Sequence, residues 1–328
     1  MKSYLSIILF AIVILYSGSG FAISKNIVIA VFGDSVTRGV WANSKIGNPG
    51  LDFYLSAHKA LKRFNKLTPT QLALINHPEI DLMRYTRLME SKFGFTSRNQ
   101  LSGAAGNQGY SFGTRLSAYT SMKVNVINVG LLAGSYQYGK AQLSQLKRKL
   151  AGRKPDYILV NFTVIDALSG SSPEMFKDYV ARFFKILTHR YPRSKIIVTP
   201  LTIPPSISTL SDKISVPAFM GGDAYTCGDI QQLAYGLFNS DTSHMIGVRQ
   251  KIQEMNGVLV EELSVIQKGL SPYETFGGKL IITETPGLEH NNWEDYLAAD
   301  CVHPNLKGQE IIGNLLWDAF LNQLSSVP

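Results

Sequence analysis

Residues 26–39 read NIVIAVFGDSVTRG, an apolar run that leads directly into a polar turn. Every residue of 26–32 except the first is apolar. Such an unbroken run is typical of a strand buried on both faces, as in a parallel sheet covered by helices. The Gly-Asp-Ser that follows is also ordinary turn chemistry. Ser35 is therefore either a turn residue or a nucleophile at the end of a strand, and the rest of the chain must decide.

Four more apolar runs have the same character, and they cover residues 124–130, 156–162, 194–200 and 279–284. Between them lie helical patterns, of which 171–191 is the clearest because apolar residues recur there at spacings of three and four. Strands separated by helices predict an α/β fold with one parallel sheet of about five strands between two helical layers. We expect 40–123, with helices near 52–66 and 79–94, and the irregular stretch 202–243 to be insertions into this one domain.

The first 22 residues have the layout of a secretory signal peptide. Lys2 is followed by an apolar run from Leu5 to Tyr16 and by small residues that end at Ala22. The alternative is a membrane anchor, but the run is shorter than the roughly 20 apolar residues that span a bilayer. We therefore expect one domain, 23–328, that is exported to the periplasm or secreted.

Net charge and the positions of His and Cys indicate which binding partners, metal sites and disulfides to expect. The formal net charge of the chain is +8, which favours attraction to an anionic membrane surface or acidic glycan, and no basic run indicates nucleic-acid binding. No His or Cys spacing predicts a metal site, and we expect no cofactor. In an oxidising compartment Cys227 and Cys301 are expected to form a disulfide, although two buried free thiols are the alternative.

Partners for Ser35 are found near the other end of the chain. In doubly wound sheets the active site forms beyond the carboxyl ends of the strands. Asp300 and His303 lie three residues apart in DCVHPN, just before a helix expected to begin near Asn305. One short loop can aim both side chains at one point, so that the acid orients the imidazole and the imidazole faces a serine.

The motifs FGDSVTRG, with Ser35, and DCVHP, with Asp300 and His303, resemble the first and last signature blocks of the GDSL/SGNH hydrolases. The resemblance covers most of residues 26–325. The residues of the last block are most similar to those of the phospholipase-B-like branch. It implies a flavodoxin-like three-layer α/β/α sandwich and a Ser35–His303–Asp300 triad. The implied activity is ester hydrolysis without a cofactor.

The oxyanion hole matches the family less well. The resemblance implies donation by the backbone N–H of Ser35 and by a glycine five residues after Asn128. That position holds Ala133. A bulge would bring Gly134 into place, and we prefer Gly134, although a backbone donor could come from either residue. In the third block Ile165 stands where the family has an asparagine donor, and Thr163 or Asn161 could substitute for it. A missing donor predicts that Ile165→Asn raises turnover.

From these observations we expect an exported serine hydrolase that cleaves lipid or phospholipid acyl esters. A carbohydrate O-acetylesterase is the alternative enzyme, because the same family fills that role. A binding protein that has lost efficient chemistry is the alternative of another class, and Ile165 is the residue that favours it. The proposed disulfide would tie 202–243 to the loop that carries Asp300 and His303.

Overall fold

The computed structural model describes residues 26–49, 68–71, 82–93, 98–201, 210–217, 224–236, 242–269, 280–282 and 293–325. At its centre lies a five-stranded parallel sheet with the strand order β2-β1-β3-β4-β7. The strands are β1 (Ile27–Gly33), β2 (Val124–Asn128), β3 (Tyr157–Asn161), β4 (Lys195–Val198) and β7 (Leu280–Ile282). This is the flavodoxin-like order, whose topological switch point lies between β1 and β3. The predicted α/β class is confirmed.

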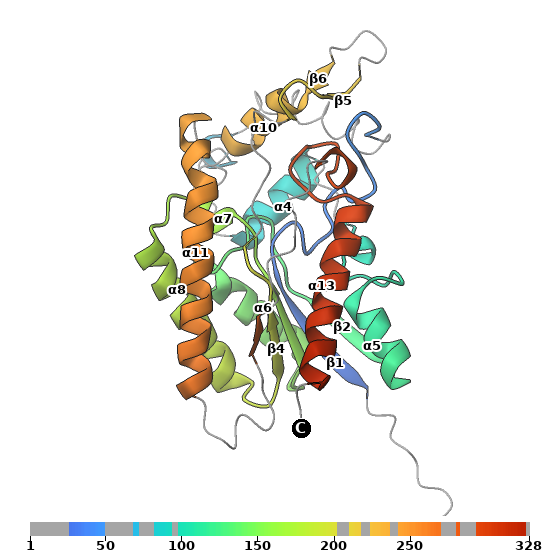
Figure 1. Ribbon diagram of the computed structural model, residues 1–328, viewed down its shortest axis with the longest axis vertical. Helices are drawn as coiled ribbons and strands as arrows, with labels where there is room; N and C mark the ends of the chain where they lie inside the picture. Colours follow the sequence, from blue (N-terminus) through green and yellow to red (C-terminus); the bar gives the residue numbers. More distant parts are fainter. Residues whose placement is uncertain are drawn as a thin grey trace, which may run out of the picture.

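Both faces of the sheet are covered, which explains the unbroken apolar runs. In β1, Val28, Ala30 and Phe32 pack against one helical layer, whereas Ile27, Ile29 and Val31 pack against the other. The first layer consists of α6 (Gly139–Leu150), α8 (Pro173–Arg190) and α11 (Thr242–Gly269), and the second of α5 (Phe112–Thr120) and α13 (Leu306–Ser325). Figure 1 shows α8 and α11 to the left of the strands, with α5 and α13 to the right.

Helix α8 illustrates how the sequence sets an element. The Ser172 side chain accepts a hydrogen bond from the Met175 N–H at 3.2 Å, and Pro173 occupies the first turn. Its apolar stripe is buried against the sheet as the spacing predicted, through Phe176, Val180, Phe183 and Leu187. The stripe fixes the rotation of the helix, because any other orientation would expose these large side chains.

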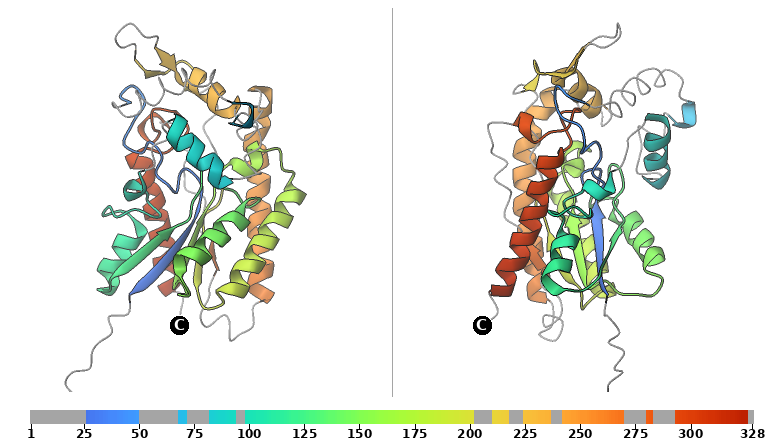
Figure 2. Two further views of the ribbon diagram at one scale, coloured as in Figure 1. Left: turned by 180° about the vertical axis from the view of Figure 1, so that it is seen from behind. Right: turned by 90° about the vertical axis from the view of Figure 1, so that its right-hand side faces the viewer.

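The insertions gather at the end of the sheet where β1 finishes. They include α4 (Leu82–Phe93), the antiparallel pair β5 (Ile214–Val216) and β6 (Tyr225–Thr226), and α10 (Cys227–Gly236). Both views in Figure 2 show these elements beyond the same end of the strands. The functional residues must therefore be sought between the carboxyl ends of the strands and these insertions.

Some expectations concern other parts of the chain. Helix α4 lies within the predicted helix 79–94, whereas the stretch predicted as irregular, 202–243, contains α10 and the β5–β6 pair. The predicted helix 52–66 and the expected signal peptide 1–22 lie outside the described residues. None of the helices that the structure describes is long and apolar enough to cross a membrane.

Candidate active site

Ser35 lies in a tight turn directly after β1. The turn is formed by Asp34, whose buried carboxylate accepts the Val36 N–H at 2.8 Å and the Thr163 N–H at 2.8 Å, together with the Thr163 hydroxyl. Burial raises the pKa of Asp34, and these hydrogen bonds oppose that rise. Gly33 is required before the turn, because a Cβ there would collide with the Thr37 side chain and a carbonyl oxygen of β3. Half-buried Ser35 is thus held on a rigid base.

Asp300 and His303 lie in a second turn that precedes α13. One oxygen of the Asp300 carboxylate accepts the N–H groups of Val302 at 3.2 Å and His303 at 2.9 Å. The other oxygen bonds to Nδ1 of His303. Asn305 then accepts the Gly308 N–H at 3.2 Å, which caps the first turn of the helix that was expected to begin here.

The structure brings Ser35, His303 and Asp300 together. Nε2 of His303 lies 2.6 Å from Oγ of Ser35, although the two residues are 268 positions apart in the sequence. Asp300 and His303 are 3% and 9% exposed, so their contact is largely shielded from water. Burial alone would lower the pKa of His303, but the charge of Asp300 and its hydrogen bond outweigh burial and raise this pKa above its ordinary value. Asp300 therefore favours an imidazolium.

A buried glutamine ties the two turns to each other. Gln309 of α13 donates from Nε2 to the Val36 carbonyl at 3.0 Å and accepts the Gly103 N–H at 3.0 Å. The helix that follows His303 is therefore bonded to the residue that follows Ser35. The indole of Trp41 also meets the His303 ring edge to face, with 5.7 Å between the ring centroids.

The turn 131–134 lies beside the turn of Ser35, and its contacts bear on the choice between Ala133 and Gly134. The Gly134 N–H donates to the Leu131 carbonyl at 2.9 Å, and a Cβ on Gly134 would collide with the Gly33 carbonyl oxygen. Gly134 is therefore a close-packing residue whose donor is already used. The family position itself, Ala133, has φ of 56°, a left-handed conformation that favours glycine. No bulge is needed to keep the family register.

Backbone donors without an acceptor among the described residues remain at this edge. Among the residues that the structure describes, the N–H groups of Ser35 and Ala133 donate to no protein acceptor. The Leu131 N–H, in contrast, donates to the Gly33 carbonyl at 3.2 Å, which fixes the turn against the end of β1. The Ala133 amide of the 131–134 turn and the Ser35 amide are therefore both available for a ligand oxygen.

The side chains expected to replace the family asparagine are already engaged. The Thr163 hydroxyl bonds to Asp34, and the Asn161 amide bonds to Thr37 at 3.3 Å and Thr199 at 2.8 Å. Ile165 begins α7 (Ile165–Leu168), is 8% exposed and packs in an apolar cluster with residues of α4 and the 131–134 turn. Ile165 has no side-chain donor, the Thr163 hydroxyl donates to Asp34, and one of the two Asn161 amide protons is used by Thr37.

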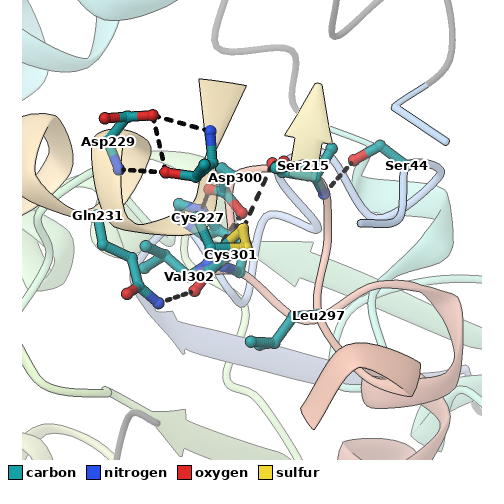
Figure 3. Close-up of a disulfide and its surroundings, with 12 residues drawn as sticks. Ser44, Ser215, Cys227, Asp229, Gln231, Leu297, Asp300, Cys301 and Val302 are labelled. Carbon is teal, nitrogen blue, oxygen red and sulfur yellow. Dashed lines mark hydrogen bonds and ion pairs between the residues drawn. A yellow bond between two sulfur atoms is a disulfide. The ribbon is translucent and has the colours of Figure 1, made fainter. Parts of the chain in front are cut away.

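Cys227 and Cys301 form a disulfide, with their Cα atoms 5.5 Å apart, as the sequence predicted. Cys301 lies between Asp300 and His303 in the left-handed region, with φ of 57°. Its carbonyl accepts a hydrogen bond from Nε2 of buried Gln231 at 2.8 Å, and the Ser215 hydroxyl bonds to the neighbouring Ala299 carbonyl. Figure 3 shows these groups of α10 and β5 gathered around the disulfide.

Two features of the site were missed by sequence reasoning. No motif marks Trp41 beside His303, and the sequence preferred Gly134 without excluding Ala133 as the backbone donor. The family register alone pointed to Ala133. Among the described residues, no group of three or more His, Cys, Asp and Glu side chains is arranged to hold a metal ion.

The family model described as GDSL-like Lipase/Acylhydrolase matches residues 29–316. No curated protein sequence matches the chain. Among solved structures, the lipase/acylhydrolase from Enterococcus faecalis is similar, with 14% identity, a TM-score of 0.43 and coverage of 90% of this chain and 96% of that one. The psychrotrophic esterase EstA from Pseudoalteromonas sp. has 11% identity, a TM-score of 0.44 and coverage of 91% and 99%.

Proposed function

Because the chain belongs to the GDSL-like lipase/acylhydrolase family, we propose that it hydrolyses esters with Ser35 as nucleophile, His303 as general base and Asp300 as the orienting acid. The observation that carries this proposal is the 2.6 Å contact between Ser35 Oγ and His303 Nε2. A serine hydroxyl is a weak nucleophile until a base within hydrogen-bond reach takes its proton.

The proposed reaction follows the usual acyl-transfer sequence. Ser35 Oγ attacks the ester carbonyl carbon while its proton passes to His303 Nε2. The tetrahedral intermediate collapses, and His303 returns the proton to the departing alkoxide, which leaves as an alcohol. Water then attacks the acyl-enzyme with His303 again as base, which releases the acid and restores Ser35. Asp300 stabilises the imidazolium that forms in both halves.

Negative charge develops on the carbonyl oxygen in each half of the reaction. We assign its stabilisation to the backbone N–H groups of Ser35 and Ala133, which have no acceptor in the described protein. Backbone donors held in a rigid turn need no reorganisation during the reaction. The proposed hole therefore lacks the side-chain donor that the family asparagine would supply.

The proposed substrates are lipid or phospholipid acyl esters. The net charge of +8 supports attraction to an anionic lipid surface. The DCVHP block supports the phospholipase-B-like branch, and residues 1–22 support export to the periplasm or beyond. A disulfide in the structure is consistent with an oxidising compartment.

A binding protein on the same fold is the second candidate. Ile165 in place of a donor is the observation that favours it, because catalysis gains from a third hydrogen bond to the oxyanion. Binding alone requires none of the contacts between Ser35, His303 and Asp300. Their close association supports the enzyme.

The test uses protein expressed from Ile23 and a substrate panel of p-nitrophenyl esters of increasing chain length, a lysophospholipid and an acetylated glycan. We expect ester hydrolysis that Ser35→Ala reduces by several orders of magnitude, because the triad residues act as a unit. Ser264→Ala is the matched control, since Ser264 is an exposed serine of α11 that bonds only within its own helix.

Covalent labelling provides an independent readout. A fluorophosphonate probe should form one adduct, located by mass spectrometry on the peptide that contains Ser35. Labelling elsewhere, or a Ser35→Ala protein that keeps more than about a tenth of the activity, would contradict the proposal. Lipid or glycan binding without hydrolysis of any ester would favour the binding protein.

A further inference from the structure

Helix α4 contacts the turn that carries the unused Ala133 N–H. The helix belongs to the long segment between β1 and β2, and its described residues place Tyr85, Leu88 and Met89 in one apolar cluster with Leu131, Leu132, Ala133 and Ile165. Helix α4 thus packs against the 131–134 turn through apolar side chains, and Gly33 at the end of β1 contacts the same turn through its carbonyl.

A single buried hydroxyl makes the polar contact between the helix and the turn. Thr86 is 4% exposed, and its Oγ1 accepts the Leu132 N–H at 3.1 Å. Three successive amide positions of the turn therefore have defined environments. The Leu131 N–H donates to Gly33, the Leu132 N–H donates to Thr86, and the Ala133 N–H has no acceptor among the residues that the structure describes.

The conformation of the turn is one that it would not adopt readily alone. Ala133 has φ of 56°, a region that costs a non-glycine residue free energy and persists only where the surroundings impose it. The hydrogen bond from Leu132 to Thr86 acts on the residue directly before Ala133. Loss of that bond allows the Ala133 peptide to rotate toward an unstrained conformation.

A second contact acts on the other side of the turn. Arg38, three residues after Ser35, donates from Nη1 to the Gly130 carbonyl at 3.1 Å and pairs with Glu90 of α4. Thr86 and Glu90 are four residues apart and so lie on one face of the helix. That face contacts the 130–134 segment directly through Thr86 and indirectly through Arg38.

We propose that Thr86 is a positioning residue for ester hydrolysis, which acts by holding the Ala133 N–H in the orientation that stabilises the oxyanion. The inference rests on the proposed function. It assigns a role in the chemistry to an insertion outside the motif blocks, and it explains how alanine occupies a position that favours glycine.

The test compares Thr86→Val with wild type on an ester and on the matching thionoester. The valine keeps the shape of the side chain and removes the acceptor. In a thionoester the charge develops on sulfur, a weak hydrogen-bond acceptor, so oxyanion donors contribute little to its cleavage. We expect Thr86→Val to lower kcat for the ester about tenfold or more, with KM changed less than about threefold and the thionoester rate nearly unchanged. Thr86→Ser should restore the ester rate.

Thr120→Val is the matched control. Thr120 at the end of α5 also accepts a backbone N–H, from Met122 at 3.3 Å, but it lies just before β2, at the amino ends of the strands. We expect Thr120→Val to leave the ratio of ester to thionoester rates unchanged. A Thr86→Val protein that loses both rates equally, or that behaves like Thr120→Val, would overturn the inference.

Two further outcomes keep the test decisive. If Thr86→Val does not fold, Glu90→Gln takes its place, because it weakens the contact to Arg38, and we expect the same ratio to fall about twofold to threefold. An unchanged ratio in Glu90→Gln would then overturn the inference. A wild-type protein without Ser35-dependent ester hydrolysis refutes the proposed function itself, which is a different result from an unchanged ratio.

Discussion

At the scale of single residues, protonation of the proposed site depends on Asp300. Its carboxylate accepts two backbone N–H groups of its own turn and bonds to Nδ1 of His303. The backbone bonds fix the carboxylate, and the fixed carboxylate fixes the imidazole. The same contact raises the pKa of His303 above its ordinary value, against the opposing effect of burial.

Asp300→Asn should therefore change both the rate and its pH dependence. His303 must be neutral to accept the Ser35 proton, so kcat/KM of the wild type should rise with pH through the raised pKa of His303, above its ordinary value near 6.5. Without the carboxylate, this rise of kcat/KM should move to lower pH, and kcat should fall by roughly 10³–10⁴. The measurement is kcat/KM from pH 5 to 9 on one ester.

Asp295→Asn is the control for that profile, because Asp295 is an exposed aspartate that pairs with Lys307. In this variant kcat/KM should rise with pH over the same range as in the wild type. If kcat/KM of Asp300→Asn rises at the same pH as in the wild type, or at higher pH, then Asp300 does not interact with His303 as its hydrogen bond indicates.

At the scale of elements, the packing of α7 against α4 changes what Ile165 is expected to do. The sequence predicted that an asparagine here would supply a donor and raise turnover. In the structure, Ile165 is 8% exposed and its neighbours in the cluster are apolar side chains such as Leu88 and Leu131. An amide at this position loses apolar contacts and places a polar group in an apolar cluster.

We therefore expect Ile165→Asn to lower the free energy of unfolding by about 2–4 kcal/mol without raising turnover. Ile165→Val, the control, removes one methylene group and should cost about 0.5–1.5 kcal/mol. Denaturant unfolding and kcat on a small ester measure the two effects. A gain in kcat of about 10² or more in Ile165→Asn would show that the asparagine reaches the oxyanion after all.

The elements also show which features could be read from the sequence. Strands such as β1 and the helix α8 were predicted because burial on defined faces leaves a pattern in the apolar residues. Helix α10 was missed because its place depends on contacts distant in sequence, including the bonds of Cys227 and Gln231 to Cys301. Likewise, the choice between Ala133 and Gly134 depends on a single backbone angle, which leaves no such pattern.

At the scale of the whole molecule, the disulfide joins the α10 insertion to the loop of Asp300 and His303. It closes a separation of 74 residues, and the hydrogen bonds of Gln231 and Ser215 reinforce the same junction (Figure 3). The left-handed Cys301 is held in place by these contacts. The insertion thus stabilises the loop that provides the base.

Replacement of both cysteines, Cys227→Ala with Cys301→Ala, should lower the free energy of unfolding by about 4 kcal/mol in the chain-entropy model. We expect activity to fall as well, because the Asp300–His303 turn loses its covalent attachment. Thermal unfolding and ester hydrolysis measure the two effects, and mass spectrometry of the unreduced wild type checks the bond. Two free thiols in the wild type, or a double variant as stable as the wild type, would contradict this prediction.

The distance of 268 residues between Ser35 and His303 also determines when the protein can become active. A ribosome makes the serine early and the histidine among the last residues of the domain, shortly before α13. Every unfinished or truncated chain that lacks this last part carries a hydroxyl with no base beside it. In the proposed mechanism, activity therefore requires a chain that extends at least through His303.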